Sequence, residues 1–104
     1  MYIDDVIKGY KVNILSDEEM KAIGFYDAKS YWLYSKVLTY WNKEPEFSID
    51  IEVYKDDGHI EYCILDEEAF QPVSRFSKEK EQELYEECKK HIKYLVEQQV
   101  LVEV

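Results

Sequence analysis

The residues able to carry chemistry in this chain are mostly carboxylates, and they concentrate in one stretch. Between Glu44 and Glu68 the sequence has ten carboxylates and a single basic residue, Lys55. Paired carboxylates such as Asp50 and Glu52 occur in general acid/base sites and in two-metal sites. A flat, wet strand face lacks the cleft that such sites need. We therefore interpret the stretch first as a charged surface, and a small metal-dependent hydrolase is the alternative.

Histidine and cysteine are scarce, with two of each in the chain. Cys88 and His91 stand three positions apart on a predicted helix and could offer two ligands, but a structural zinc site needs four and the spacing nominates no others. Nucleophile-elbow, phosphate-loop, dinucleotide and H-E-x-x-H motifs are absent from the sequence. We predict no enzymatic activity, no metal, no cofactor, and reduced thiols at Cys63 and Cys88.

The element that must position the carboxylates is a β-hairpin from Phe47 to Asp66. Apolar side chains alternate with polar ones along both arms, as expected of strands buried on one face; they are Phe47, Ile49, Ile51, Val53, Ile60, Tyr62 and Ile64. The Asp57-Gly58 dipeptide favours a two-residue type I′ turn. That turn predicts Val53 opposite Tyr62 and Ile51 opposite Ile64.

The other face of this hairpin is the predicted partner-binding surface. It would present acidic and apolar side chains together, and the turn adds two more carboxylates; the predicted residues are Asp50, Glu52, Tyr54, Asp56, Asp57, Glu61 and Leu65. The competing interpretation is a solvated face that only keeps the protein soluble.

Other elements follow from local patterns. A short helix is expected between Ile3 and Tyr10, and a second from Asp17 to Ile23, because Ser16 and Glu19 form a capping box. Tyr31 to Trp41 also fits a helical stripe, but its aromatic and β-branched content favours a strand.

In the last third of the chain, the sequence predicts a loop followed by one long helix. Asp66 to Phe76 reads as a loop anchored to the core by Phe70 and Phe76. Lys78 to Gln98 is an amphipathic helix capped by Ser77, and Val100 to Val104 can add a strand to the sheet edge.

Together these elements predict an α+β fold in a single domain, 1–104. It consists of an antiparallel three- to four-stranded β-meander, a long C-terminal α-helix packed on one face, and short N-terminal helices.

Composition restricts the partner. The 104 residues carry a formal charge of −10, with 46% hydrophobic and 15% aromatic residues. Such a charge repels nucleic acid and anionic membranes. We expect a cytoplasmic protein that binds a protein partner with a basic surface, while its oligomeric state stays open.

The segment Asp66-Glu67-Glu68-Ala69-Phe70-Gln71-Pro72, after a hairpin and before a long helix, resembles small uncharacterised proteins associated with phages of Gram-positive bacteria. The resemblance implies a phage or mobile-element context and carries no active site. The functional hypothesis is a non-catalytic acidic module that inhibits a partner by occupying its basic nucleic-acid-binding surface, as anti-defence, anti-CRISPR-like or immunity proteins do. An acidic housekeeping protein is a further alternative.

Overall fold

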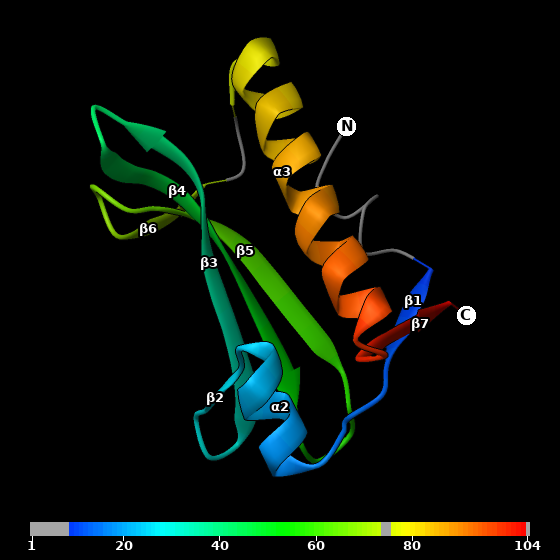
Figure 1. Cartoon of the computed structure of the whole chain (residues 1–104). Coiled ribbons are helices and arrows are strands. Elements are labelled where there is room, and N and C mark those ends of the chain that lie inside the picture. Colours follow the sequence, from blue (N-terminus) through cyan, green and yellow to red (C-terminus); the bar gives the residue numbers. More distant parts are fainter. Residues whose placement is uncertain (1–8, 74–75, 104) are drawn as a thin grey trace.

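The predicted hairpin forms the middle of a five-stranded antiparallel sheet. The computed structural model describes residues 9–73 and 76–103. The strands follow the order β2-β3-β4-β5-β6, a meander in which each strand pairs with the next along the chain (Figure 1). Their bounds are β2 Tyr26–Asp27, β3 Tyr31–Trp41, β4 Glu44–Tyr54, β5 Ile60–Asp66 and β6 Gln71–Val73. The α+β class is confirmed, but the sheet has more strands than predicted.

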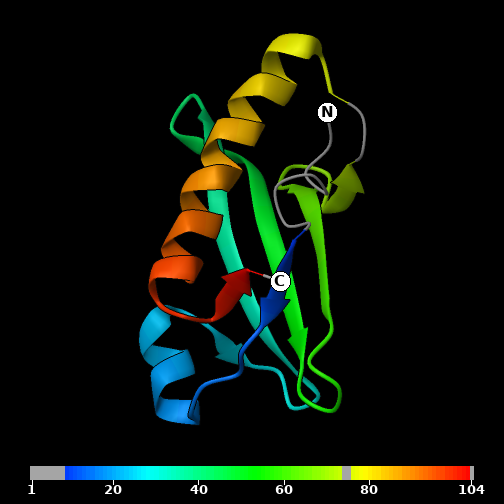
Figure 2. The same cartoon turned by 90° about the vertical axis from the view of Figure 1, so that its right-hand side faces the viewer.

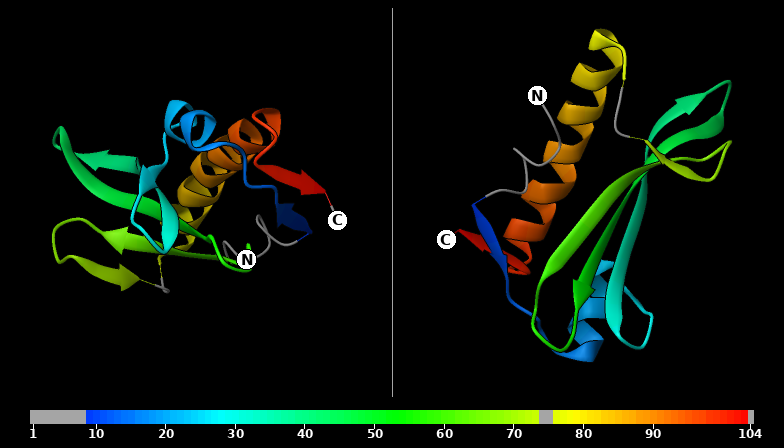
Figure 3. Two further views of the ribbon diagram at one scale, coloured as in Figure 1. Left: turned by 90° about the horizontal axis from the view of Figure 1, so that it is seen from below. Right: turned by 180° about the vertical axis from the view of Figure 1, so that it is seen from behind.

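Both described helices pack against the same face of this sheet, called here the inner face (Figures 1 and 3). Helix α2 (Asp17–Ile23) begins at the Ser16 cap, whose Oγ accepts from the Glu19 amide at 3.2 Å, and it ends at Gly24, where φ is 125°. Helix α3 (Lys78–Glu97) begins after Ser77. Both predictions are confirmed. The predicted helix between Ile3 and Tyr10 falls largely outside the described residues.

The core lies between the inner face and the apolar stripe of α3. Leu84, Cys88, Ile92 and Leu95 are buried on the helix, and they face buried sheet residues that include Trp32, Tyr34, Ile49, Ile51, Val53 and Ile64. The inner face predicted from alternation is therefore confirmed. The Tyr31 to Trp41 strand is also confirmed, because its inner side chains Trp32 and Tyr34 are each 1% exposed.

The hairpin register differs from the prediction by two residues. Val53 pairs with Ile60 and Ile51 pairs with Tyr62. The loop is longer than a type I′ turn because Asp57 accepts the His59 amide at 3.0 Å and Asp56 accepts the Asp57 amide at 2.8 Å. A shift of two preserves the alternation, so the same side chains still face inward.

Two predictions about the last third of the chain are corrected. Gln71–Val73 is strand β6 rather than loop, and Pro72 is tolerated there because β6 is an edge strand. Phe76 does pack against Phe47, with ring centroids 5.4 Å apart, but Phe70 is 76% exposed and anchors nothing to the core.

The C-terminal strand does not extend the main sheet. Strand β7 (Leu101–Glu103) pairs instead with β1 (Tyr10–Val12) in a separate two-stranded sheet beside α3 (Figure 2). Val100 and Leu101 are buried and contribute to the core. The β1–β7 pair thus packs beside α3.

The primed turn of this protein lies at Asn42-Lys43, between β3 and β4. Both residues have positive φ, 49° and 68°, and Trp41 pairs with Glu44 across them. This is a two-residue hairpin loop of the I′ kind. The strand β4 therefore starts three residues earlier than the predicted hairpin.

Replacing Lys43 with glycine is expected to stabilise the fold by roughly 0.5–1 kcal/mol. Side chains with a Cβ are disfavoured at positive φ, and Asn-Gly is the preferred I′ pair. Thermal and urea unfolding measure the gain. Lys43→Ala is the control, since it removes the same charge and keeps the Cβ. A gain of equal size in Lys43→Ala would contradict the turn geometry.

Candidate protein-interaction surface

The face of the sheet opposite α3, called here the outer face, is not covered by either described helix (Figures 1 and 3). Direct cross-strand partners point to the same side of a sheet. The strand pairing therefore arranges the side chains of the outer face in rows. From the β4–β5 turn outward the rows are Tyr31 and Tyr54; Tyr26, Leu33, Glu52 and Glu61; Ser35, Asp50 and Cys63; Val37, Ser48, Leu65 and Pro72.

Like charges stand directly opposite each other in the second row. Glu52 of β4 pairs with Glu61 of β5. Such a pair destabilises an antiparallel ladder, whereas an opposite charge at either position would favour it. A surface that served stability and solubility alone would gain from a lysine here. His59 lies beside Glu61, with its ring nitrogen Nε2 3.7 Å from the carboxylate, and relieves part of the repulsion when protonated. The remaining like-charge pair is a local conflict of the kind found at functional sites.

Two of the outer-face carboxylates are held in place by hydroxyl donors. Ser35 donates to Asp50 at 2.5 Å, and Tyr54 donates to Glu52 at 2.8 Å. The hydrogen bond to Glu52 raises the pKa of Tyr54 to about 12. The carboxylates keep further lone pairs for a partner, and their positions are fixed before binding.

Aromatic rings border the acidic rows at the turn end. Tyr54 stacks on His59 with centroids 4.2 Å apart and planes 5° apart, and Tyr31 contacts Tyr54 at 5.3 Å. Tyr26 is 64% exposed. Tyrosine combines apolar area with a polar group, which suits contact surfaces.

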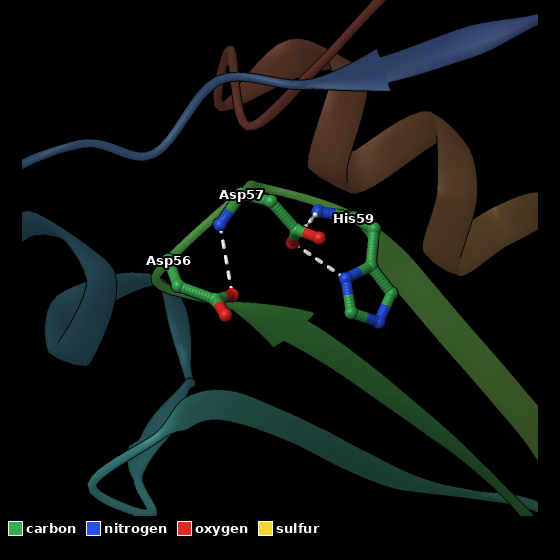
Figure 4. A group of neighbouring side chains, drawn as sticks. All are labelled: Asp56, Asp57 and His59. Carbon is green, nitrogen blue, oxygen red and sulfur yellow. Dashed lines mark hydrogen bonds and ion pairs between the residues drawn. The ribbon is translucent and has the colours of Figure 1, made fainter.

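The β4–β5 turn gathers Asp56, Asp57 and His59, whose ligand atoms all lie within 4.8 Å of one another (Figure 4). Asp57 binds the His59 ring nitrogen Nδ1 at 2.5 Å. Each of the three side chains is exposed and engaged in closing the loop. The carboxylates Asp50, Glu52 and Glu61 are not among the described groups of three that meet this spacing.

The second histidine has a different role, in the inner layer. His91 Nδ1 lies 2.8 Å from the Tyr34 hydroxyl. Burial lowers the pKa of His91 and raises the pKa of Tyr34 to about 12. Cys88, one turn away, is buried, which raises its pKa to about 12. This group therefore serves the core, and the Cys88–His91 spacing reflects packing.

The two histidines are expected to titrate on opposite sides of the ordinary value of about 6.5. The hydrogen bond to Asp57 raises the pKa of His59, so its contribution to stability is present below 6.5 and is lost as pH rises through the raised value. For His91, whose pKa is lowered, the contribution is present above 6.5 and is lost as pH falls toward the lowered value. NMR titration of the imidazole protons measures both.

Asp57→Asn is the matched variant for this titration. It should bring the His59 pKa back toward 6.5 and leave that of His91 unchanged. Coincident titration of the two histidines in the parent protein would contradict the assignment.

Cys63 lies in the middle of the outer face. Partial burial raises the pKa of its thiol, and the carboxylates of Asp50 and Glu52 add to the effect. Thiolate is the reactive form, so this cysteine is held unreactive. It supplies apolar surface between the acidic rows.

The structure brings most of the predicted site residues together and separates some. Asp50, Glu52, Tyr54 and Glu61 lie on adjacent positions of the outer face. Leu65 lies at the opposite end from Tyr54, and Asp56 and Asp57 belong to the turn. The β3 and β2 contributions were missed, namely Tyr26, Tyr31, Leu33, Ser35 and Val37; alternation in β3 was visible, but rings on both sides of it hid which face was outer.

Comparison with known proteins gives a fold and no activity. No protein-family model matches the sequence, and no curated protein matches it. The crystal structure of a DUF1831 family protein from Lactobacillus plantarum superposes with a TM-score of 0.69, at 14% identity, covering 91% of this chain and 86% of that one. The two chains share a fold. Among the described residues, no helix has the length and apolar character needed to cross a membrane.

Proposed function

We propose that this protein is a non-catalytic acidic module that binds a basic surface of a protein partner through its outer face. The observation that supports the proposal is the Glu52–Glu61 pair, two carboxylates set directly opposite each other on the outer face. Like charges in such a position disfavour the strand pairing, although the His59 ring nitrogen Nε2 lies 3.7 Å from Glu61 and offsets part of the repulsion when it is protonated. A cationic partner group inserted between them removes the repulsion. The free energy that the repulsion costs in the free protein is then regained when the partner binds.

The apolar side chains that share the outer face with the carboxylates support the same proposal. Leu33, Cys63 and Leu65 are partly exposed on a face with no described covering element. Interfaces combine a few apolar or aromatic anchors with charged groups that steer the partner. An exclusively solvating face does not need these anchors.

We further propose that the partner surface is one that binds nucleic acid and that the protein acts as an inhibitor. Such surfaces are the strongly basic ones, and the net charge of −10 suits competition for them. The resemblance of the 66–72 segment to phage-associated proteins motivates the mobile-element context.

Affinity capture with the immobilised protein, followed by elution with salt, is the experiment that tests this function. The captured partner should release duplex DNA or RNA when the acidic protein is added. A partner that binds nucleic acid and this protein simultaneously would contradict the inhibitor proposal. A partner whose binding does not depend on the outer face would contradict the module itself.

A further inference from the structure

A second surface lies at the far end of the sheet, where β4 extends beyond β5. β5 ends at Asp66, opposite Phe47, and one more backbone bond joins the Glu67 amide to the Glu46 carbonyl at 3.0 Å. Glu44 and Pro45 of β4 continue past this point. The gap beside them is a groove of about 770 Å³, and Figures 1 and 3 show the β3–β4 and β5–β6 turns projecting together there.

The groove combines exposed aromatic surface with a dense acidic lining. It is lined by Trp41, Asn42, Glu44, Pro45, Glu46, Phe47, Asp66, Glu67 and Glu68. Trp41 is 68% exposed. Tyr40 of β3 and Phe70 of the β5–β6 turn are 63% and 76% exposed, but they are not among the lining residues. A large aromatic side chain exposed in the lining of a groove is suited to anchor a binding partner.

The walls of the groove are rigid before any partner arrives. Asp66 accepts the Glu68 and Ala69 amides at 3.0 and 3.2 Å, and Ser48 donates to Glu67 at 2.6 Å. The opposite wall is the two-residue turn at Asn42-Lys43. Preorganised walls reduce the entropy cost of binding.

Charge decides what the groove accepts. Of its five carboxylates, Glu46 is neutralised by Lys80 at 2.8 Å, which lowers the pKa of Glu46. The other four carboxylates, Glu44, Asp66, Glu67 and Glu68, line the groove together with Trp41. A second copy of this chain, with a net charge of −10, is repelled from such a groove, whereas a cationic polypeptide is attracted.

We propose that this groove binds an arginine-bearing basic peptide segment, with one guanidinium stacked on Trp41 and paired with the surrounding carboxylates. Arginine stacks on aromatic faces and forms bidentate bonds with carboxylates, which lysine does not do equally well. The site is separate from the outer face: Glu52 lies eight residues from Glu44 along β4, roughly 26 Å at 3.3 Å per residue.

The test uses a fluorescein-labelled hexa-arginine peptide and fluorescence anisotropy at about 50 mM salt, where screening is weak. The parent protein should bind hexa-arginine more tightly than hexa-lysine. Trp41→Ala should weaken binding about 2- to 30-fold, which corresponds to the 0.5–2 kcal/mol of a cation–π contact. Trp41→Phe should lose less. Because Trp41 is exposed, these variants should melt like the parent.

Matched charge variants distinguish peptide binding in the groove from attraction by the net charge of the protein. Glu44→Gln with Glu68→Gln should weaken peptide binding, and Glu97→Gln with Glu103→Gln, which removes two exposed charges elsewhere, should not. In NMR spectra the indole proton of Trp41 should shift on titration while that of buried Trp32 stays.

The following results would overturn the proposal. Unchanged binding in Trp41→Ala, or equal losses from the two double variants, would show attraction by charge alone. Loss of peptide binding only in Asp50→Asn, Glu52→Gln, Glu61→Gln would place the peptide on the outer face instead, which keeps the proposed function and rejects the groove. Dimers of the parent that Trp41→Ala dissociates would make a second copy the occupant.

Discussion

Replacing Ile51 with alanine is expected to lower the free energy of unfolding by about 2–5 kcal/mol, the range for deleting a buried aliphatic side chain. Ile51 is fully buried in β4, between Tyr34 of β3 and Tyr62 of β5. Both neighbours are held in ladders, so the cavity cannot collapse easily. In a domain of this size the melting temperature should fall by about 8 °C or more.

Ile14→Ala is the matched control for this prediction. It makes the same chemical change at a residue that is 37% exposed, so the expected loss is below about 1 kcal/mol. Urea unfolding of parent and variants gives the free energies. If Ile51→Ala and Ile14→Ala unfolded alike, the inner face assigned to β4 would be wrong.

Neutralising the outer face is expected to weaken partner binding about tenfold or more. The variant is Asp50→Asn, Glu52→Gln, Glu61→Gln. Because asparagine and glutamine retain an acceptor oxygen, the bonds from Ser35 and Tyr54 can persist. The loss should appear largely in the association rate, since exposed charges steer the encounter, and it should shrink as salt rises and the Debye length falls below about 10 Å.

The control removes three exposed carboxylates from the α3 and β7 side of the molecule, by Glu79→Gln, Glu97→Gln, Glu103→Gln. Total charge then matches between the two triple variants. Equal losses of affinity in both triple variants would show that binding depends on the net charge and not on the outer face.

The unfolding free energy of the outer-face variant provides a second test. Removal of the Glu52–Glu61 repulsion should leave the outer-face variant as stable as the parent, or more stable by roughly 0.2–1 kcal/mol. A variant that gains stability while losing its partner shows that the carboxylates serve binding. Because Glu61→Gln also removes the His59–Glu61 ion pair, Glu52→Gln alone is the cleaner test of the repulsion. A loss of stability in that single variant would contradict the assigned repulsion between Glu52 and Glu61.

Local patterns in the sequence were sufficient for the elements with strong periodicity or capping. The capping box of Ser16 and Glu19 predicted where α2 begins. The Ser77 cap predicted the start of α3, and its apolar stripe, Leu84, Cys88, Ile92 and Leu95, predicted its buried side. The aromatic content of 31–41 favoured the strand that forms. In each case the deciding interactions lie within a few residues of each other. Alternation likewise predicted the inner face of the hairpin.

Features that depend on side chains bonding to turn backbone were not predictable in the same way. Asp57-Gly58 carries the dipeptide of a I′ turn, yet the Asp56 and Asp57 carboxylates close a longer loop by accepting amides. The I′ turn forms at Asn42-Lys43, where lysine is an unusual second residue. Pro72 argued against a strand, but the rule applies to central strands and β6 lies at an edge.

For the candidate site, the sequence predicted only the residues that the hairpin contributes. Asp50, Glu52, Tyr54 and Glu61 do share a face, as the alternation indicated. Leu33 and Ser35 join them only through the register with β3, which no local signal encodes. The groove at Trp41 depends on where β5 ends relative to β4, and that is a property of the assembled sheet.

Methyl NMR of the complex with the captured partner tests the central claim most directly, because leucine and valine methyls occupy both sides of the sheet. The outer-face methyls of Leu33, Val37 and Leu65 should shift or broaden on titration, while those of Leu84 and Leu95, on the buried side of α3, should stay in place. Perturbation confined to residues of α3 or the β1–β7 pair, with the outer-face methyls unchanged, would contradict the assignment of the outer face as the binding surface.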